Sequence, residues 1–255
     1  MAHAGRKASC AVPWEGGKQI KIENGGWQTV GPSQIGFYHD DNPPQSLDSA
    51  GIKEVIDDFK TSAVRALEAE YKVLEIHAAH GYLIHQFLSP LSNHRTDIYG
   101  GSFENRIRLL LEITEAIQTV WPQNFPLFVR ISATDWSDGG WDADESVKLS
   151  AILKTKGVDL IDCSSGGLVP DVKIPLGPGY QVHFSERIKK ETGILTGAVG
   201  LITGEQQAEK ILLNNQADLI FLARASLRDP YFGLHAAHNL GDDFLWPLQY
   251  KRAKL

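Results

Sequence analysis

The chain has 255 residues and carries 25 lysines and arginines against 31 aspartates and glutamates, a formal net charge of −6. This length suits a single domain, and the acidic balance gives no electrostatic attraction to nucleic acid. The apolar runs are shorter than the ~20 residues that cross a bilayer, and the absence of a secretory segment and of a dense cysteine pattern predicts a soluble cytoplasmic protein with no membrane partner.

The first 50 residues are rich in glycine and show no clear periodicity, which predicts loops and a hairpin. From residue 51 to 240, amphipathic stretches of helical length alternate with short apolar runs, the pattern of βα units around a parallel sheet. Helices are expected at 51–69, 104–121, 143–156, 181–192, 203–214 and 229–240. Strands are expected at 73–79, 127–132, 158–165, 194–200 and 217–223, and residues 241–255 form a tail.

Three of the expected helices begin with capping signals. Ser102 is the expected N-cap of the second helix. Asp142 with Glu145, and Thr203 with Gln206, have the three-residue spacing of a capping box.

The number of strands limits the fold. Five strands follow residue 70, whereas a closed barrel of alternating strands and helices needs eight. We therefore predict an α/β protein of the (β/α)8 TIM-barrel type, truncated at its N-terminus, with residues 1–255 forming one partial-barrel domain. Its open sheet would be completed by rearrangement or by oligomerisation.

Polar residues and glycines lie at successive strand ends, where the active site of a barrel is built. In chain order these are His77, His80 and Tyr82, then Arg130 and Ser132, then Ser164, Ser165 and Gly166, then Gly197 and Gly200, and then Ala223 and Arg224. The first group offers neutral hydrogen-bond donors and a proton source. The last groups place glycines and a cation beside helix N-termini, where a phosphate group binds.

Each feature also has a structural interpretation. His77 and His80 can bond to backbone carbonyls, and a His-x-x-His pair can bind zinc, although no convincing further ligand stands nearby. Tyr82 can be a packed aromatic side chain, and Arg224 a surface ion pair. The functional interpretation depends on all of them falling at successive strand ends, and we predict no metal site.

The segment HAAHGYLIHQFLSPLSNHRTDIYGGSFENR (77–106) resembles the signature of the old yellow enzyme family of FMN-dependent ene-reductases, in the branch of bacterial NADPH dehydrogenases of the YqjM type. Six other segments resemble the family in the same order, so that the resemblance covers essentially the whole chain. They are AHAGRKAS, GPSQIGF, LFVRISATDW, GVDLIDCSSGG, TGAVGLIT and ADLIFLARASLRDPYF.

The resemblance implies an NADPH dehydrogenase or ene-reductase that reduces the C=C bond of α,β-unsaturated carbonyl compounds with FMN as cofactor and NADPH as reductant. It implies that His77 and His80 hydrogen-bond to the carbonyl oxygen of the substrate, which stabilises developing enolate charge. Tyr82 matches the proton donor to the α-carbon.

The same resemblance assigns the cofactor contacts. Arg130 matches the arginine beside the flavin pyrimidine ring. The segments that hold the ribityl chain and phosphate contain Ser165, Gly166, Gly197, Ala223 and Arg224. Arg252 resembles the arginine that reaches into a neighbouring subunit's substrate site, which implies a homo-oligomer.

The chain also departs from the family pattern. Family members have three βα units ahead of the matched segments, and a flavin-contacting glutamine before AHAGRK, that this sequence lacks. FMN would then keep its phosphate and arginine contacts and lose one wall of its pocket. Two alternatives stay open: a flavin-free acid–base enzyme, such as an isomerase, dehydratase or cyclase, and a non-catalytic truncated homologue.

Overall fold

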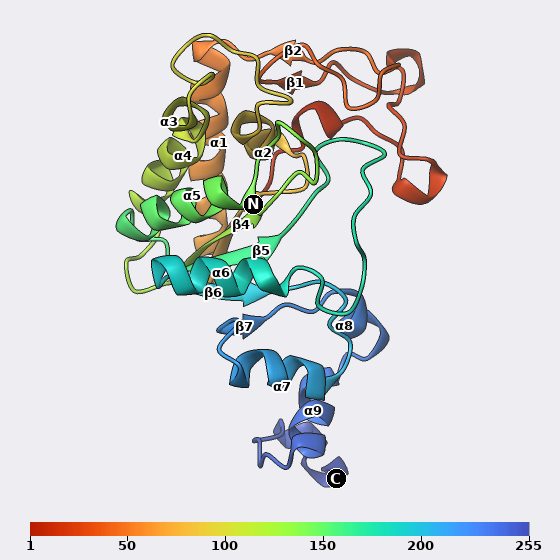
Figure 1. Cartoon of the computed structure of the whole chain (residues 1–255). Coiled ribbons are helices and arrows are strands. Elements are labelled where there is room, and N and C mark those ends of the chain that lie inside the picture. The colour runs from red at the N-terminus through yellow and green to blue at the C-terminus, as the bar shows by residue number, and fades with distance from the viewer. Residues whose placement is uncertain (255) are drawn as a thin grey trace.

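The computed structural model describes residues 1–254. Its main sheet has five parallel strands in the order β3-β4-β5-β6-β7, so each strand pairs with its neighbours along the chain. The strands are β3 (Leu74–Ala78), β4 (Leu127–Ser132), β5 (Leu160–Ser164), β6 (Leu195–Ala198) and β7 (Leu219–Ile220). All five predicted strands are present. In Figure 1 the arrows of β5 and β6 lie side by side and point the same way.

Helices stand between successive strands along the chain. They are α1 (Ser49–Glu68), α2 (Leu83–Leu88), α3 (Phe103–Arg106), α4 (Arg108–Gln118), α5 (Ala143–Thr155), α6 (Val182–Thr192), α7 (Glu205–Leu213), α8 (Arg224–Arg228) and α9 (Phe232–Leu240). Of these, α1, α4, α5 and α6 form a layer along one face of the sheet (Figure 1). Among the described helices, none has the length and apolar character needed to cross a membrane.

Two helical predictions need correction, and two helices were missed. The single helix expected at 104–121 is divided between α3 and α4, although the intervening Ile107 keeps helical dihedral angles (φ −80°, ψ −13°). The last helix begins at Phe232 rather than at 229. The short helices α2 and α8 were not predicted, because five or six residues are too few to show a helical period.

The capping predictions are confirmed at two of three helices. The side chain of Ser102 accepts a hydrogen bond from Asn105 N, and that of Asp142 accepts one from Glu145 N. The third prediction is wrong: Gly204 is the N-cap of α7, and Thr203 N donates to Oε1 of Gln207, one residue beyond the expected Gln206.

The sheet has one apolar face and one polar face. Alternate residues of β3 and β4 are buried against the helix layer, and they belong to one hydrophobic core with residues of α1 and α4. Those strand residues are Leu74, Ile76, Ala78, Leu127, Val129 and Ile131. Because side chains alternate along a strand, the half-buried Glu75, His77 and Arg130 point to the opposite face. The helices therefore stabilise one face and leave the other for polar side chains.

The N-terminal segment lies against the carboxyl ends of the strands. It contains short 3-10 turns and the strands β1 (Val30–Gly31) and β2 (Gln45–Ser46), which pair in parallel. The expected hairpin is limited to one antiparallel bridge between Cys10 and Gln19. The segment starts beside β3, where the carbonyl of Met1 accepts a hydrogen bond from His77 N at 2.8 Å.

Candidate active site

A row of residues in register crosses the polar face of the sheet. His77 on β3 is paired with Arg130 on β4, Arg130 with Asp162 on β5, and Asp162 with Gly197 on β6. Because parallel strands in register place paired residues at the same height, three ionisable side chains from three strands meet there. The row lies one or two residues before the strand ends.

His77, His80 and Tyr82 form a rim at the carboxyl end of β3. The ring centroid of His77 lies 5.0 Å from that of His80 and 5.2 Å from that of Tyr82. The turn between them is held by neighbouring strands, since His80 N donates to Ser132 Oγ at 2.9 Å and His80 Nε2 lies 2.6 Å from Ser164 Oγ. The structure therefore brings together the three residues expected at this strand end.

Both rim histidines are neutral at physiological pH. Burial, with a further contribution from the nearby Arg130 charge, lowers the pKa of His77 to about 4 and that of His80 to about 3. A neutral imidazole has one N–H donor and one acceptor nitrogen. The rim can thus offer hydrogen bonds to a carbonyl oxygen without carrying a charge.

Lys7 lies behind the rim and was not identified from the sequence. Its Nζ donates to the carbonyl oxygens of His80 and Gly167, both at 3.0 Å, and lies 4.4 Å from the ring centroid of Phe37. Burial, with a smaller effect of Arg6, lowers the pKa of Lys7 to about 8. Lys7 therefore joins the loops that follow β3 and β5.

These two loops meet at a pair of glycines. Gly81 has a φ of +72°, and a Cβ there would lie 2.1 Å from the carbonyl oxygen of Gly167. We expect Gly81→Ala to lower the free energy of unfolding by roughly 2–4 kcal/mol, because left-handed strain adds to a backbone clash. Gly101→Ala is the matched control, since Gly101 has a φ of +79° with open space around it, and about 1 kcal/mol is expected there. Chemical denaturation measures both, and equal losses would contradict the clash.

Asp162 is a buried carboxyl group opposite Arg130. Its side chain has no exposed surface, and its Oδ2 lies 3.2 Å from Arg130 Nε. Within residues 1–254, neither carboxyl oxygen accepts a directed hydrogen bond. Burial raises the pKa of Asp162 to about 7, with Arg130 acting against the rise and Glu75 adding to it. Sequence reasoning missed this residue, although a lone acidic residue inside the apolar run LIDC was a usable signal.

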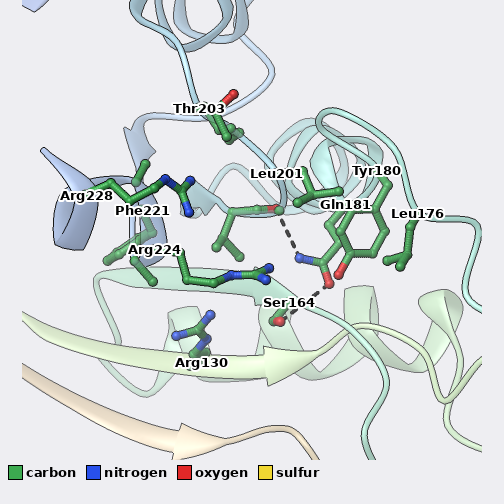
Figure 2. Close-up of a pocket in the computed structure, with 15 residues that line it drawn as sticks. Arg130, Ser164, Leu176, Tyr180, Gln181, Leu201, Thr203, Phe221, Arg224 and Arg228 are labelled. Atoms are coloured by element: carbon green, nitrogen blue, oxygen red, sulfur yellow. Dashed lines mark hydrogen bonds between the residues drawn. The ribbon is translucent and has the colours of Figure 1, made fainter. Parts of the chain in front are cut away.

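A cavity of about 420 Å³ adjoins the rim. Figure 2 shows the side chains of Arg130, Arg224 and Arg228 directed into it, with Gln181 hydrogen-bonded on the opposite side. Gln181 Nε2 donates to the carbonyl of Val199 at 3.1 Å, and its Oε1 accepts from Ser165 Oγ at 2.6 Å. Ser164 also lines the cavity, so its contact with His80 connects the cavity to the rim.

The predicted cofactor residues differ in their relation to this cavity. Arg130, Ala223 and Arg224 line it, whereas Ser165 reaches it through Gln181. Gly166 has a φ of +70° in the loop after β5, and Gly197 leaves room for the ring of Phe221, which lines the cavity. Arg252 is exposed in the 3-10 turn Leu248–Ala253 of the tail. Gln181 and Arg228 were missed because neither stands at a strand end.

The donor set of the cavity fits a flavin mononucleotide better than a metal. Guanidinium groups suit a phosphate, and the apolar Leu176 and Phe221 in the same wall suit an organic group. In the part of the chain that the structure describes, no group of three or more potential ligands is arranged to hold a metal ion.

Comparison with known proteins gives relatives for almost the whole chain. A profile of the NADH:flavin oxidoreductase / NADH oxidase family matches residues 6–243. NADPH dehydrogenase of Bacillus velezensis (strain DSM 23117 / BGSC 10A6 / LMG 26770 / FZB42) is 51% identical over 253 residues, which are 99% of this chain and 70% of that protein. NADPH dehydrogenase of Bacillus subtilis (strain 168) is 48% identical over 252 residues, which are 99% of this chain and 69% of that protein.

Solved structures share the fold. A 2-naphthoyl-CoA reductase complex superposes with a TM-score of 0.80 at 27% identity, covering 95% of this chain and 37% of that one. Morphinone reductase superposes with a TM-score of 0.68 at 25% identity, covering 87% of this chain and 62% of that one. The chain thus spans less than two thirds of these structures.

These likenesses confirm the predicted α/β class of the TIM-barrel type and the resemblance to old yellow enzymes. The sequence match is long, and it includes every segment in which the rim and the cavity residues stand. The chain belongs to the NADH:flavin oxidoreductase / NADH oxidase family.

Proposed function

We propose that the chain is an FMN-dependent NAD(P)H oxidoreductase that reduces the C=C bond of small α,β-unsaturated carbonyl compounds. The observation that carries the proposal is the pair of neutral histidines beside Tyr82, joined through Ser164 to an arginine-lined cavity. The relatives named NADPH dehydrogenase support NADPH as the reductant.

The cavity residues divide between the two ends of the cofactor. Arg224 and Arg228 line the cavity and supply cationic donors for the phosphate. Ser165, Gly166 and Gly197 stand beside the cavity, in segments that the family resemblance assigns to the ribityl chain and phosphate. Arg130 supplies a fixed positive charge for the pyrimidine end of the ring. Bound FMN would supply hydride transfer from NADPH to the β-carbon of the substrate.

The rim residues complete the reduction. His77 and His80 donate hydrogen bonds to the carbonyl oxygen, which withdraws electron density from the β-carbon and stabilises negative charge on the oxygen. In this structure His80 Nε2 is in contact with Ser164 Oγ. For His80 to donate to the substrate, the carbonyl oxygen must replace Ser164 Oγ or bind the same imidazole beside it. Tyr82 delivers a proton to the α-carbon, which balances the hydride gained at the β-carbon.

The homo-oligomer predicted through Arg252 is part of the proposal. Support comes from the C-terminal part of the chain, where large apolar side chains are exposed: Leu227, Phe244, Leu245 and Leu248. A contact between subunits would remove these apolar side chains from water, which favours association.

The first test is reconstitution of the purified protein with FMN. We expect a flavin absorption spectrum that stays with the protein through gel filtration, and NADPH oxidation that depends on an added cyclic enone. Failure to retain FMN, or enone turnover that is indifferent to flavin, would refute the proposal. The second outcome would favour the flavin-free acid–base enzyme.

Arg224→Gln is expected to weaken FMN binding about 10- to 100-fold with a smaller effect on riboflavin, which has no phosphate. A charge-assisted hydrogen bond contributes about 1.5–3 kcal/mol, and about 1.4 kcal/mol is tenfold in affinity. Quenching of flavin fluorescence measures both ligands. Arg187→Gln is the control, because Arg187 pairs with Asp144 and Glu191 away from the cavity, and an equal loss there would contradict a specific phosphate contact.

A further inference from the structure

Beneath the rim lies a buried histidine–aspartate pair that the proposed reaction does not use. His85 on α2 and Asp135 in the loop after β4 have no exposed surface, and His85 Nε2 lies 2.8 Å from Asp135 Oδ1. Among the described residues neither of these two atoms has another hydrogen-bond partner. The other carboxylate oxygen, Oδ2, accepts from Ser89 Oγ at 2.6 Å and from Trp141 N at 2.7 Å.

The partners of the pair specify where its proton lies. Gly81 N donates to His85 Nδ1 at 2.9 Å, so Nδ1 is an acceptor and carries no proton. The imidazole proton is therefore on Nε2, facing the carboxylate of Asp135. Asp135 faces a donor at each oxygen, which identifies it as the ionised form.

This arrangement controls the turn that carries the rim. Gly81 stands between His80 and Tyr82, and both His80 and Gly81 have left-handed backbones, with φ of +58° and +72°. The amide of Gly81 is bound by His85, and its carbonyl accepts from Gln86 Nε2 at 2.7 Å. The side chains of His85 and Gln86, both on α2, thus bind the amide and the carbonyl of Gly81, and these two hydrogen bonds orient the turn.

We propose that Asp135 and His85 are positioning residues that set the rim: Asp135 keeps the His85 proton on Nε2, so that Nδ1 holds the Gly81 amide and the turn presents His80 and Tyr82 together. The catalytic part of this inference rests on the proposed function. The geometric part does not, because it concerns a tautomer and one amide hydrogen bond.

Asp135→Asn tests whether the carboxylate of Asp135 sets the tautomer of His85, because asparagine has nearly the same shape as aspartate but carries an NH2 group in place of one oxygen. The asparagine Oδ1 can keep the bonds from Ser89 and Trp141, which leaves its NH2 group facing His85 Nε2. Nε2 must then become the acceptor, the proton moves to Nδ1, and two N–H groups oppose each other at Gly81. Asp159→Asn is the matched control, because Asp159 Oδ2 also accepts a backbone hydrogen bond, from Leu127 N at 2.8 Å, at the opposite end of β4.

The primary measurement is long-range ¹H–¹⁵N correlation of the histidine rings at pH 7, combined with hydrogen exchange of the Gly81 amide. We expect the Nε2–H tautomer and a protected Gly81 amide in the wild type and in Asp159→Asn. In Asp135→Asn we expect the Nδ1–H tautomer and exchange at least tenfold faster. An Nδ1–H or doubly protonated His85 in the wild type, or unchanged spectra in Asp135→Asn, would overturn the inference.

A second variant, His85→Asn, allows a kinetic comparison that distinguishes positioning of the rim from a general effect on the structure. His85→Asn puts an amide oxygen near the place of Nδ1, where it can accept from Gly81 whatever stands at position 135. With a cyclic enone as substrate, we expect Asp135→Asn to lower the kcat of the wild-type protein 10- to 100-fold and to change KM less than threefold. When His85→Asn is already present, we expect Asp135→Asn to change kcat less than threefold. Equal effects on kcat with and without His85→Asn would refute the coupling between Asp135 and His85.

The two proposals fail separately. If the wild type does not reduce the enone but shows the expected tautomer and its reversal, the proposed function fails and the positioning role stands. If the wild type reduces the enone and Asp135→Asn leaves the tautomer unchanged, the positioning role fails alone. If Asp135→Asn does not fold, two other measurements test the claim about the tautomer and the hydrogen bond. They are the tautomer of His85 in the wild type and the hydrogen exchange of the Gly81 amide in His85→Asn.

Discussion

Replacement of Tyr82 by phenylalanine is expected to lower kcat for enone reduction by about 10²- to 10⁴-fold, the usual contribution of a positioned general acid. The ring of Tyr82 packs edge-on against His77 at a centroid distance of 5.2 Å, and phenylalanine keeps that packing. Only the hydroxyl is lost, so the α-carbon would have to take its proton from water. FMN affinity is expected to stay within twofold, because Tyr82 does not line the cofactor cavity.

Steady-state kinetics with an enone, together with a flavin titration, measure this prediction. Tyr99→Phe is the control for loss of a tyrosine hydroxyl, because Tyr99 donates to Glu112 at 2.9 Å away from the rim. Reduction of the enone by Tyr82→Phe at the wild-type rate would show that another group or the solvent supplies the proton.

The second large effect is expected in the pH dependence of stability. Burial raises the pKa of Asp162 from its ordinary 3.8 to about 7. Between these values the folded carboxyl stays protonated while the unfolded one ionises, so the folded state binds more protons and stability falls as pH rises. The slope is about 1.4 kcal/mol per pH unit, which accumulates to roughly 4 kcal/mol by pH 7.

Asp162→Asn should remove this contribution, because asparagine resembles the protonated acid and does not ionise. The variant and the wild type are expected to be similar in stability near pH 4, and the variant is expected to be the more stable above pH 7. Urea denaturation at a series of pH values measures the difference, with the exposed Asp138→Asn as control. Parallel pH profiles for Asp162→Asn and the wild type would show that Asp162 ionises normally in the folded protein.

The sequence predicted the parts of the fold and site that follow from local pattern. The five strands alternate with helices long enough to show a period, so their order and parallel pairing could be predicted. Since parallel strands end at one edge of a sheet, His77, Arg130 and Arg224 could be assigned to a common region before any contact was known.

Contacts between distant segments could not be predicted in this way. Lys7 is 73 residues from the His80 carbonyl that it binds, and it belongs to the 3-10 turn Gly5–Lys7, which is too short to show a period. The sequence shows Asp162 as a lone acid in an apolar run, but only the register places it opposite Arg130. The pair of His85 and Asp135 depends on α2, a helix too short for its sequence to reveal.

The contact of Gly81 with Gly167 has a consequence for attempts to alter substrate range. The loop 166–180 borders the cavity and is an obvious target for randomisation. Its second residue, Gly167, however, lies against the backbone of His80, and Lys7 Nζ donates to the carbonyl oxygens of both residues. A library that varies Gly166 or Gly167 would disturb the histidine rim together with the pocket wall. Diversity placed at 170–178 would reshape the wall while the proton-delivering side of the site stays intact.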